Sequence, residues 1–167
     1  KRFIYAFNYG GGDQLIGELV GGGAKEGKKI KKAFLDKTPA LRQLREAITK
    51  AAGRGYIKAL DGRHIHIRSP HAALNSLLQS AGAIICKQWL VEFENEMQAQ
   101  GYTHGWNGDY CLCAWVHDEI QVAVREDLAH KVGEIAVQTI QRVTEVFNFK
   151  CPLDGEFNIG SSWAETH

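Results

Sequence analysis

The sequence predicts an α+β fold in which a basic, all-helical section precedes a section of antiparallel strands and two long helices. The first observation is that residues 1–53 carry amphipathic helical patterns separated by glycine triplets. The second is that short β-forming runs joined by turn residues begin directly after Gly53. The third is a pair of long helical patterns, from about residue 70 to 100 and from about 127 to 146. We therefore expect two sections, residues 1–53 and residues 54–167.

The chain starts inside a helical pattern. Phe3, Ile4 and Phe7 form an apolar face at helical spacing, which the glycine triplet at residues 10–12 ends. Asp13 follows the triplet and is expected to cap a short second helix.

A lysine-rich helix is predicted after the next glycine triplet, from about residue 24 to 36. Thr38 and Pro39 match the N-cap and the first position of another helix, which is expected to end near Ala52. The basic section should therefore contain helices alone.

A first hairpin is predicted where the helical patterns stop. The runs Tyr56–Leu60 and His64–Arg68 contain β-forming residues, and Asp61 and Gly62 between them are a strong hairpin signal. We expect two short antiparallel strands here.

A long helix is predicted to begin at Ser69 and Pro70 and to reach about Gln100. Its buried face is expected to consist of the apolar residues at i, i+4, i+7 and i+11, which are Leu74, Leu78, Ala81 and Ile85.

A second hairpin is predicted after a glycine-containing loop at residues 101–109. The runs Leu112–Val116 and Ile120–Val124 would form its strands. Asp127 is expected to cap an amphipathic helix that ends near Val146.

The rest of the chain predicts little chemistry. The tail, residues 149–167, is expected to hold a short strand or two. No apolar run approaches the ~18 residues that span a bilayer, so we expect a soluble, intracellular protein without membrane contacts. The cysteines lack the spacing of a zinc site and are expected to be reduced thiols. They are Cys86, Cys111, Cys113 and Cys151.

Charge is distributed unevenly along the chain. Up to Arg68 there are 15 Lys and Arg against 6 Asp and Glu, a net charge of +9, whereas the remainder has 5 against 13, a net charge of −8. Such an asymmetry is expected if one part binds phosphates and the other holds cations. Two ordinary solvated surfaces of different sign are the alternative.

The sharpest chemical signal is the pair Asp118 and Glu119 between two β-forming runs. The turn holds two adjacent carboxylates and neither Gly nor Asn, so local turn preferences are broken where charges must be held. Hard cations such as Mg²⁺ bind carboxylate oxygens, which makes Asp118 a candidate ligand; a second carboxylate would have to come from elsewhere. An exposed acidic turn is the alternative.

Lys1, Tyr5 and Tyr9 lie at i, i+4 and i+8 on one helical face. A lysine can meet triphosphate oxygens while aromatic rings one and two turns away stack on a base or pack against a sugar. Tyrosines at the edge of a core helix are the alternative.

His71, Asn75 and Gln79 form another stripe spaced by four, on the long helix. Amide side chains can donate to the acceptors that every base pair displays in the minor groove. A solvated helix face is the alternative.

Taken together, these motifs resemble family A (polymerase I type) DNA polymerases, and most of all the replicative enzymes of podovirus-like phages. Residues 1–10 resemble motif B of the fingers. Residues 60–63 followed by residues 69–81 resemble the palm segment that follows the minor groove, and residues 116–119 resemble motif C. The resemblance thus implies a partial polymerase I-type chain, with fingers in residues 1–53 and palm in residues 54–167.

The resemblance implies nucleotide contacts for three residues. Lys1 would meet the incoming triphosphate, Tyr5 its sugar, and Tyr9 the templating base. The implied DNA contacts near the primer end are Asn75, Gln79, His71 and Arg63.

The resemblance also implies a catalytic turn. Asp118 would bind the catalytic Mg²⁺ ions, His117 would approach the primer terminus and Glu119 would support the site; Lys1 completes the implied catalytic set. His167 matches a chain-terminal histidine of the phage relatives, to which we assign no role.

The implied reaction is addition of deoxynucleotides to a primer in phage DNA replication, in the cytoplasm of a bacterial host. The implied partners are primer-template DNA, deoxynucleoside triphosphates and an upstream part of the same polymerase. Motif A, whose aspartate bridges both metal ions, is not within these residues, and the segment near Gly53–Tyr56 is shorter than in the relatives. We therefore expect the isolated chain to be inactive. A non-catalytic DNA-binding remnant and a metal-dependent nuclease are the alternatives.

Overall fold

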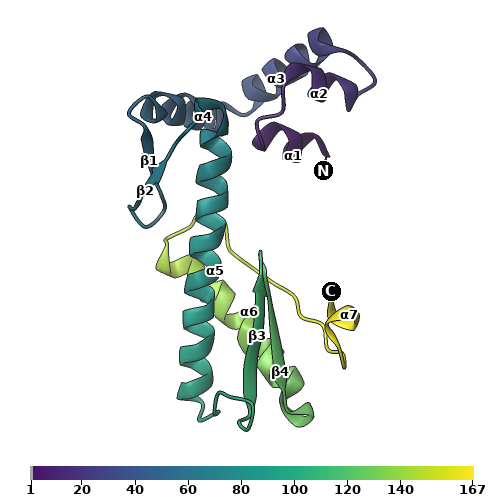
Figure 1. The fold of residues 1–167 in the computed structure, drawn as a ribbon, viewed down its shortest axis with the longest axis vertical. Helices are drawn as coiled ribbons and strands as arrows, with labels where there is room; N and C mark the ends of the chain where they lie inside the picture. Colours follow the sequence, from purple (N-terminus) through teal and green to yellow (C-terminus); the bar gives the residue numbers. More distant parts are fainter. Residues whose placement is uncertain (1) are drawn as a thin grey trace. The chain divides into compact units, whose positions relative to one another are not determined.

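The computed structural model describes residues 2–167, with the backbone alone at His71 (Figure 1). The chain divides into two compact units, Lys1–Ala81 and Gly82–His167, with the boundary inside the long helix α5. The fingers and palm bounds expected from the sequence, residues 1–53 and 54–167, concern function and remain a prediction.

The first unit begins with the helices α1 (Arg2–Asn8), α2 (Asp13–Glu18), α3 (Ala24–Lys37) and α4 (Pro39–Ala52) (Figure 1). The all-helical prediction for this part of the chain is confirmed. The bounds agree closely because glycine triplets and the Thr-Pro pair act locally, on the backbone of the residues that carry them.

Asp13 is not the N-cap of α2, as the sequence suggested. Gly12 occupies that position and Asp13 is the first helical residue. The Asp13 carboxylate lies 3.0 Å from Lys31 Nζ, which also donates to the carbonyl oxygen of Gly11 at 3.0 Å. An acidic side chain is favourable in the first turn of a helix. Asp13 therefore links α2 to α3 instead of capping α2.

Close approach of α2 and α3 depends on a glycine. Gly27 is buried in α3, and a Cβ atom there would lie 1.8 Å from the carbonyl oxygen of Asp13 and 2.7 Å from the backbone nitrogen of Gly17. Only a residue without a side chain fits this crossing.

Phe7 anchors α1. Its side chain is 2% exposed and lies edge-on to Phe34 of α3, with the ring centroids 5.0 Å apart. The guanidinium of Arg45 lies 4.8 Å from the Phe7 ring centroid, within the range of a cation–π interaction. Burial of Phe7 therefore fixes α1 against α3 and α4.

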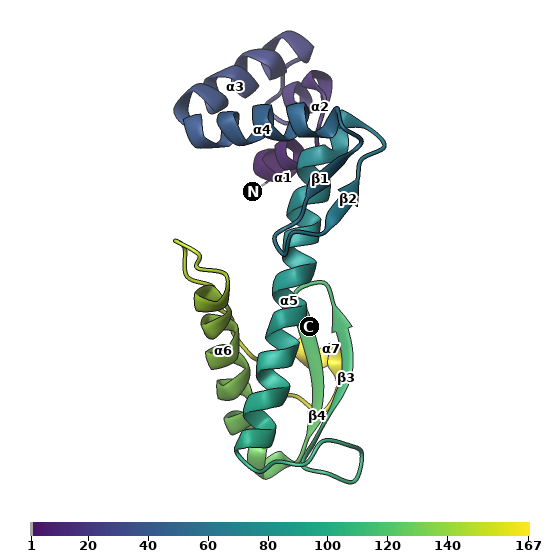
Figure 2. The ribbon, with the colours of Figure 1, turned by 90° about the vertical axis from the view of Figure 1, so that its left-hand side faces the viewer.

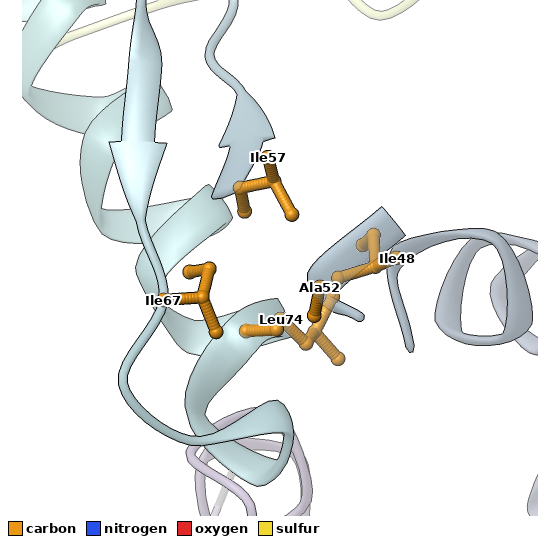
Figure 3. Close-up of a cluster of buried hydrophobic side chains, with 6 residues drawn as sticks. Ile48, Ala52, Ile57, Ile67 and Leu74 are labelled. Atoms are coloured by element: carbon orange, nitrogen blue, oxygen red, sulfur yellow. The ribbon is translucent and has the colours of Figure 1, made fainter. Parts of the chain in front are cut away.

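The predicted first hairpin is confirmed by β1 (Tyr56–Lys58) and β2 (His64–His66), which pair antiparallel with Ile57 opposite Ile65. Gly62 in the connecting turn has a φ of 85°, which favours glycine. Figure 3 shows the side chains that gather beneath this hairpin. The buried core of the unit is Ile48, Ala52, Ile57, Ile67, Ala73 and Leu74.

The long helix begins with a 3₁₀ turn, η1 (Pro70–Ala72), and continues as α5 (Ala73–Ala99). Its predicted length is confirmed, but its predicted apolar face is only partly right: Leu74 is 8% exposed, whereas Leu78 is 41% exposed. In the second unit, α5 buries Ile84, Phe93 and Met97, and Ile85 is half-buried. Two cores lie along one helix, so a single stripe does not describe it.

The second unit contains β3 (Tyr110–Val116), β4 (Glu119–Val124), a 3₁₀ turn η2 (Glu126–Leu128), α6 (Ala129–Val146) and α7 (Trp163–Thr166). In the view of Figure 2, α6 lies on one side of α5 and the β3–β4 hairpin on the other. The residues of the buried core come from α5, β3 and α6, and are Phe93, Met97, Tyr110, Val132 and Ile135.

Two expectations for this unit were wrong. Asp127 does not cap α6: it lies in η2, and its carboxylate accepts hydrogen bonds from Arg125, with Arg125 Nη2 2.7 Å from Asp127 Oδ2. The tail forms no strand within the described residues, only the short helix α7. A Cβ atom at Gly133 would lie 2.3 Å from the Phe157 ring, so α6 offers the tail a side-chain contact in place of a strand edge.

Two further expectations concern chemistry. All four cysteines are free thiols, as expected. Within residues 2–167, no helix is both long and apolar enough to cross a membrane.

We expect Gly27→Ala to lower the free energy of unfolding by about 1–3 kcal/mol, because the new methyl group overpacks the α2–α3 crossing. Gly82→Ala is the matched control, because Gly82 also lies in a helix but, apart from its chain neighbours and its own helix backbone, no described atom lies within 4 Å of its missing Cβ. That control should raise stability by up to about 1 kcal/mol. Denaturant unfolding followed by circular dichroism measures both, and equal effects of the two substitutions would contradict the crossing.

Candidate functional site

The β3–β4 hairpin turns through His117 and Asp118. Val116 pairs with Glu119, so the acidic pair is divided: Asp118 lies in the turn, and Glu119 is the first residue of β4. His117 has a φ of 57°, a left-handed conformation that is uncommon for a residue with a side chain. Trp115 Nε1 donates to the His117 carbonyl oxygen at 2.7 Å and thereby braces the turn.

Glu119 is held by three donors. Its carboxylate accepts hydrogen bonds from Gln121 Nε2 at 2.5 Å and Trp163 Nε1 at 3.0 Å, and lies 2.9 Å from His167 Nδ1. The bonds from Gln121 and His167, with a smaller contribution from Trp163, hold the pKa of Glu119 below its ordinary value. Glu119 is thus an internal acceptor that binds the chain end to the hairpin.

Asp118 differs from its neighbour. Its side chain is exposed, and none of the residues from 2 to 167 forms a hydrogen bond or ion pair with its carboxylate. The charge of Asp118 affects one buried group, the thiol of Cys86. Burial raises the pKa of this thiol, and the negative charge of Asp118 raises it further. The hairpin therefore presents one available carboxylate beside one that is fully occupied.

An exposed carboxylate on a braced turn fits a hard divalent cation, but a single carboxylate does not make a site. Within the described part of the chain, no group of three or more His, Cys, Asp or Glu side chains could hold a metal ion. Asp118 is therefore at most one ligand of a site that needs others.

The predicted nucleotide-binding tyrosines lie in the first unit. Tyr5 is 57% exposed and Tyr9 is 54% exposed, and their rings stack with centroids 6.4 Å apart. Lys1, the third residue of this set, lies outside the described residues. Tyr5 of α1 and Tyr9, which directly follows this helix, form an exposed aromatic surface.

One contact joins the two predicted helical stripes of the first unit. Gln79 Nε2 donates to the hydroxyl oxygen of Tyr9 at 2.8 Å, and Asn75, one turn before Gln79, is half-buried. The side chain of His71 lies outside the described structure. The structure therefore brings Tyr9 and Gln79 together, although 70 residues separate them.

Arg63 lies at the tip of the first hairpin. Its Nε donates to Asp61 Oδ2 at 2.7 Å, and this hydrogen bond and the charge of Asp61 raise the pKa of Arg63. The side chain is exposed, so a phosphate could replace Asp61 as its partner.

Trp163 and His167 bind Glu119 in the structure, although neither had a role predicted from the sequence. They are 44 and 48 residues away in the chain, and no local pattern links them to the hairpin. The one available signal was the match of His167 to a chain-terminal histidine of the relatives.

Residues 1–165 match the model of DNA polymerase family A. The chain is 49% identical to the DNA-directed DNA polymerase of Enterobacteria phage T3 over 183 aligned positions, which cover all of this chain and 26% of that protein. The identity to the enzyme of Escherichia phage T7 is also 49%, with the same coverage. The DNA polymerase I of Pseudomonas aeruginosa is 27% identical, over all of this chain and 19% of that protein.

A solved structure, the POL domain of Pol1 from M. smegmatis in complex with DNA primer-template and dNTP, is similar with a TM-score of 0.72. It is 18% identical and covers 85% of this chain and 26% of that chain, which confirms the α+β fold. The chain spans about a quarter of the length of its phage relatives. By its match over residues 1–165, the chain belongs to DNA polymerase family A.

Proposed function

We propose that this chain is the fingers-and-palm part of a template-directed DNA polymerase that extends a primer 3′ end in phage DNA replication. The observation that carries the proposal is the available Asp118 carboxylate on a braced hairpin turn, in a chain that is 49% identical over its whole length to the DNA-directed DNA polymerase of phage T3. The acidic second unit, with its net charge of −8, suits cation binding.

Asp118 would hold one side of a pair of Mg²⁺ ions. When bound, such ions stabilise charge on the attacking and leaving oxygens of nucleotidyl transfer. No internal bond of the Asp118 carboxylate has to break before a metal ion binds, because Trp163 and His167 bond the neighbouring Glu119 instead. His117, in the same turn, would lie toward the primer terminus.

The first unit would bind the nucleotide and the duplex. Tyr5 would pack against the sugar and Tyr9 against the templating base, and their exposed, stacked rings leave both accessible. Lys1 would meet the triphosphate. The duplex contacts proposed here are Asn75, Gln79, His71 and Arg63.

The site needs a partner segment. A second carboxylate must complete the metal pair, and we propose that it comes from an upstream part of the same polymerase. Primer-template DNA and deoxynucleoside triphosphates would be the other partners, and the cytoplasm of a bacterial host the place of action.

Glu119 would act as a positioning residue for Asp118. The bonds from Trp163 and His167 fix the first residue of β4, and through the backbone they fix the turn that carries Asp118. Movement of Asp118 by about 1 Å would misplace a metal ion and slow the reaction strongly.

The metal role is tested in a T3 DNA polymerase whose matching segment is replaced by this chain. Asp118→Asn should lower turnover by about a hundredfold or more and leave duplex affinity nearly unchanged, because the metal ligand is lost while the fold is kept. Asp127→Asn is the matched control, since Asp127 is an exposed acid of the same unit that pairs with Arg125. The unfused chain should not extend a primer. Equal turnover of Asp118→Asn and its parent would remove Asp118 from the site.

The placement of Tyr5 is tested with nucleotides that lack the 3′-hydroxyl group. The phenol of Tyr5 can take over the hydrogen bond that this hydroxyl normally makes, and a phenylalanine cannot. In the same chimera, Tyr5→Phe should raise discrimination against dideoxynucleotides by about tenfold or more, with normal nucleotides incorporated at near-parental rates. Tyr56→Phe is the control. Competition of the two nucleotide types in single-nucleotide extension measures the ratio, and an unchanged ratio would place the sugar elsewhere.

The link between Glu119 and the chain end predicts a pH dependence. Since folding lowers the pKa of Glu119, its bonds stabilise the tail above the ordinary carboxyl pKa of ~4.3 and are lost as pH falls through the lowered folded value. The indole N–H resonance of Trp163 should therefore shift in acid, below pH 4.3 or so, as the Glu119 carboxylate is protonated. Trp106, which is 81% exposed, is an internal control whose resonance should not change. A Glu119→Gln chain with the same titration of Trp163 would contradict the link.

A further inference from the structure

Two cysteines occupy one strand of the hairpin with a single residue between them. Cys111 pairs with Ala123, and the register of β3 and β4 shifts between Leu112 and Ala114. Cys113 is therefore the extra residue of a β-bulge, a place where the strand bends and is locally easier to deform.

The Cys113 thiol lies close to the backbone of Cys111. Cys113 Sγ lies 3.5 Å from the carbonyl oxygen of Cys111, so its side chain turns back along the strand toward the other cysteine. Burial raises the pKa of Cys111, and the neighbouring thiol of Cys113 raises it further. Cys111 is half-buried and Cys113 is exposed, which leaves one thiol open to solvent and the other within its reach.

The spacing is compatible with a bond between the sulfurs. Residues i and i+2 of a regular strand have Cα atoms about 6.6 Å apart, since the rise per residue is about 3.3 Å. Disulfides join Cα atoms about 4.4–6.8 Å apart. A regular strand is therefore near the upper limit, and bending at the bulge brings the pair further into the range.

We propose that Cys111 and Cys113 are a modification site that closes to a reversible intrastrand disulfide by exchange with a small-molecule disulfide, such as oxidised glutathione. The Cys113 thiolate attacks one sulfur of the oxidised glutathione, forms a mixed disulfide and releases one glutathione thiolate. The Cys111 thiolate then attacks the Cys113 sulfur and releases the second glutathione. Two cysteine thiols are oxidised, one disulfide is reduced, and the two cysteine protons end on the two glutathione thiols.

The order of attack follows from exposure. Cys113 is the accessible thiol and reacts first, whereas Cys111 is shielded from a bulky disulfide but lies beside the mixed disulfide once it has formed. Its raised pKa makes Cys111 a strong nucleophile in the fraction that is deprotonated. In a reducing compartment the pair stays open, so closure responds to oxidation of the thiol pool.

The other two cysteines are controls within the same chain. Cys86 is buried, and Cys151 is exposed in the tail. Cys151 can form a mixed disulfide but has no neighbouring cysteine in the sequence. Its reaction with glutathione therefore shows only that the thiol is exposed, and does not lead to an intrachain disulfide. We therefore use a Cys151→Ser chain as the parent, which retains three cysteines.

The experiment exposes the folded 167-residue parent to oxidised glutathione, then denatures it in acid and measures its intact mass. We expect a product lighter by two hydrogen atoms, and a fall from three alkylatable thiols to one. Dithiothreitol should restore all three. Cys111→Ser should stop at the glutathione adduct on Cys113, and Cys113→Ser should react slowly or not at all.

The proposal is overturned if the parent accumulates the glutathione adduct without the lighter product, or if peptide mapping finds Cys86 in the bond. A disulfide between two chains, seen as a dimer on a non-reducing gel, would overturn it as well. If a serine variant loses its fold, the parent still decides the matter, because phenylarsine oxide bridges two neighbouring thiols with loss of water and should consume the same pair.

Discussion

The bonds of Glu119 are the interaction on which the proposed catalytic turn depends. Gln121, Trp163 and His167 occupy this carboxylate, which leaves the adjacent Asp118 as the available charge of the hairpin. Two free carboxylates on adjacent residues would repel each other. Donors from β4 and from the chain end stabilise the ionised form of Glu119 and so make the neighbouring negative charge tolerable. The two adjacent acids therefore differ in role: Glu119 binds the hairpin to the chain end, and the Asp118 carboxylate stays available for another partner.

Other acids of the acidic unit also have internal donors. Both arginines of the unit bond its own carboxylates: Arg125 bonds both Asp109 and Asp127, and Arg142 bonds Glu96. Exposed pairs of this kind contribute little stability individually, but they reduce the repulsion that a net charge of −8 creates. Among the described residues, Glu126 and Glu134 also lack a side-chain hydrogen bond or ion pair, so the place of Asp118 in the braced turn is what distinguishes it.

Local signals explain what could be predicted from the sequence. The bounds of α4 follow from Thr38 and Pro39, and the first hairpin follows from Gly62, because these residues restrict their own backbone. The errors arose where another contact overrides the local rule. Arg125 engages Asp127, and two different cores share α5, so neither a capping rule nor a single stripe could describe them. For the site, spacing alone indicated the stripes, but not the bonds of Trp163 and His167 to Glu119.

The contact between Tyr9 and Gln79 shows how an internal bond can coexist with recognition of DNA. Gln79 uses one amide hydrogen for the Tyr9 hydroxyl. Its second amide hydrogen and its carbonyl oxygen remain for other partners, so a donor to the minor groove does not require the bond to break. Tyr9 accepts through its hydroxyl and keeps both the proton of that hydroxyl and its ring face. The bond therefore fixes the position of both side chains on the same unit while leaving the groups that a duplex and a base would use, which lowers the entropy lost on binding.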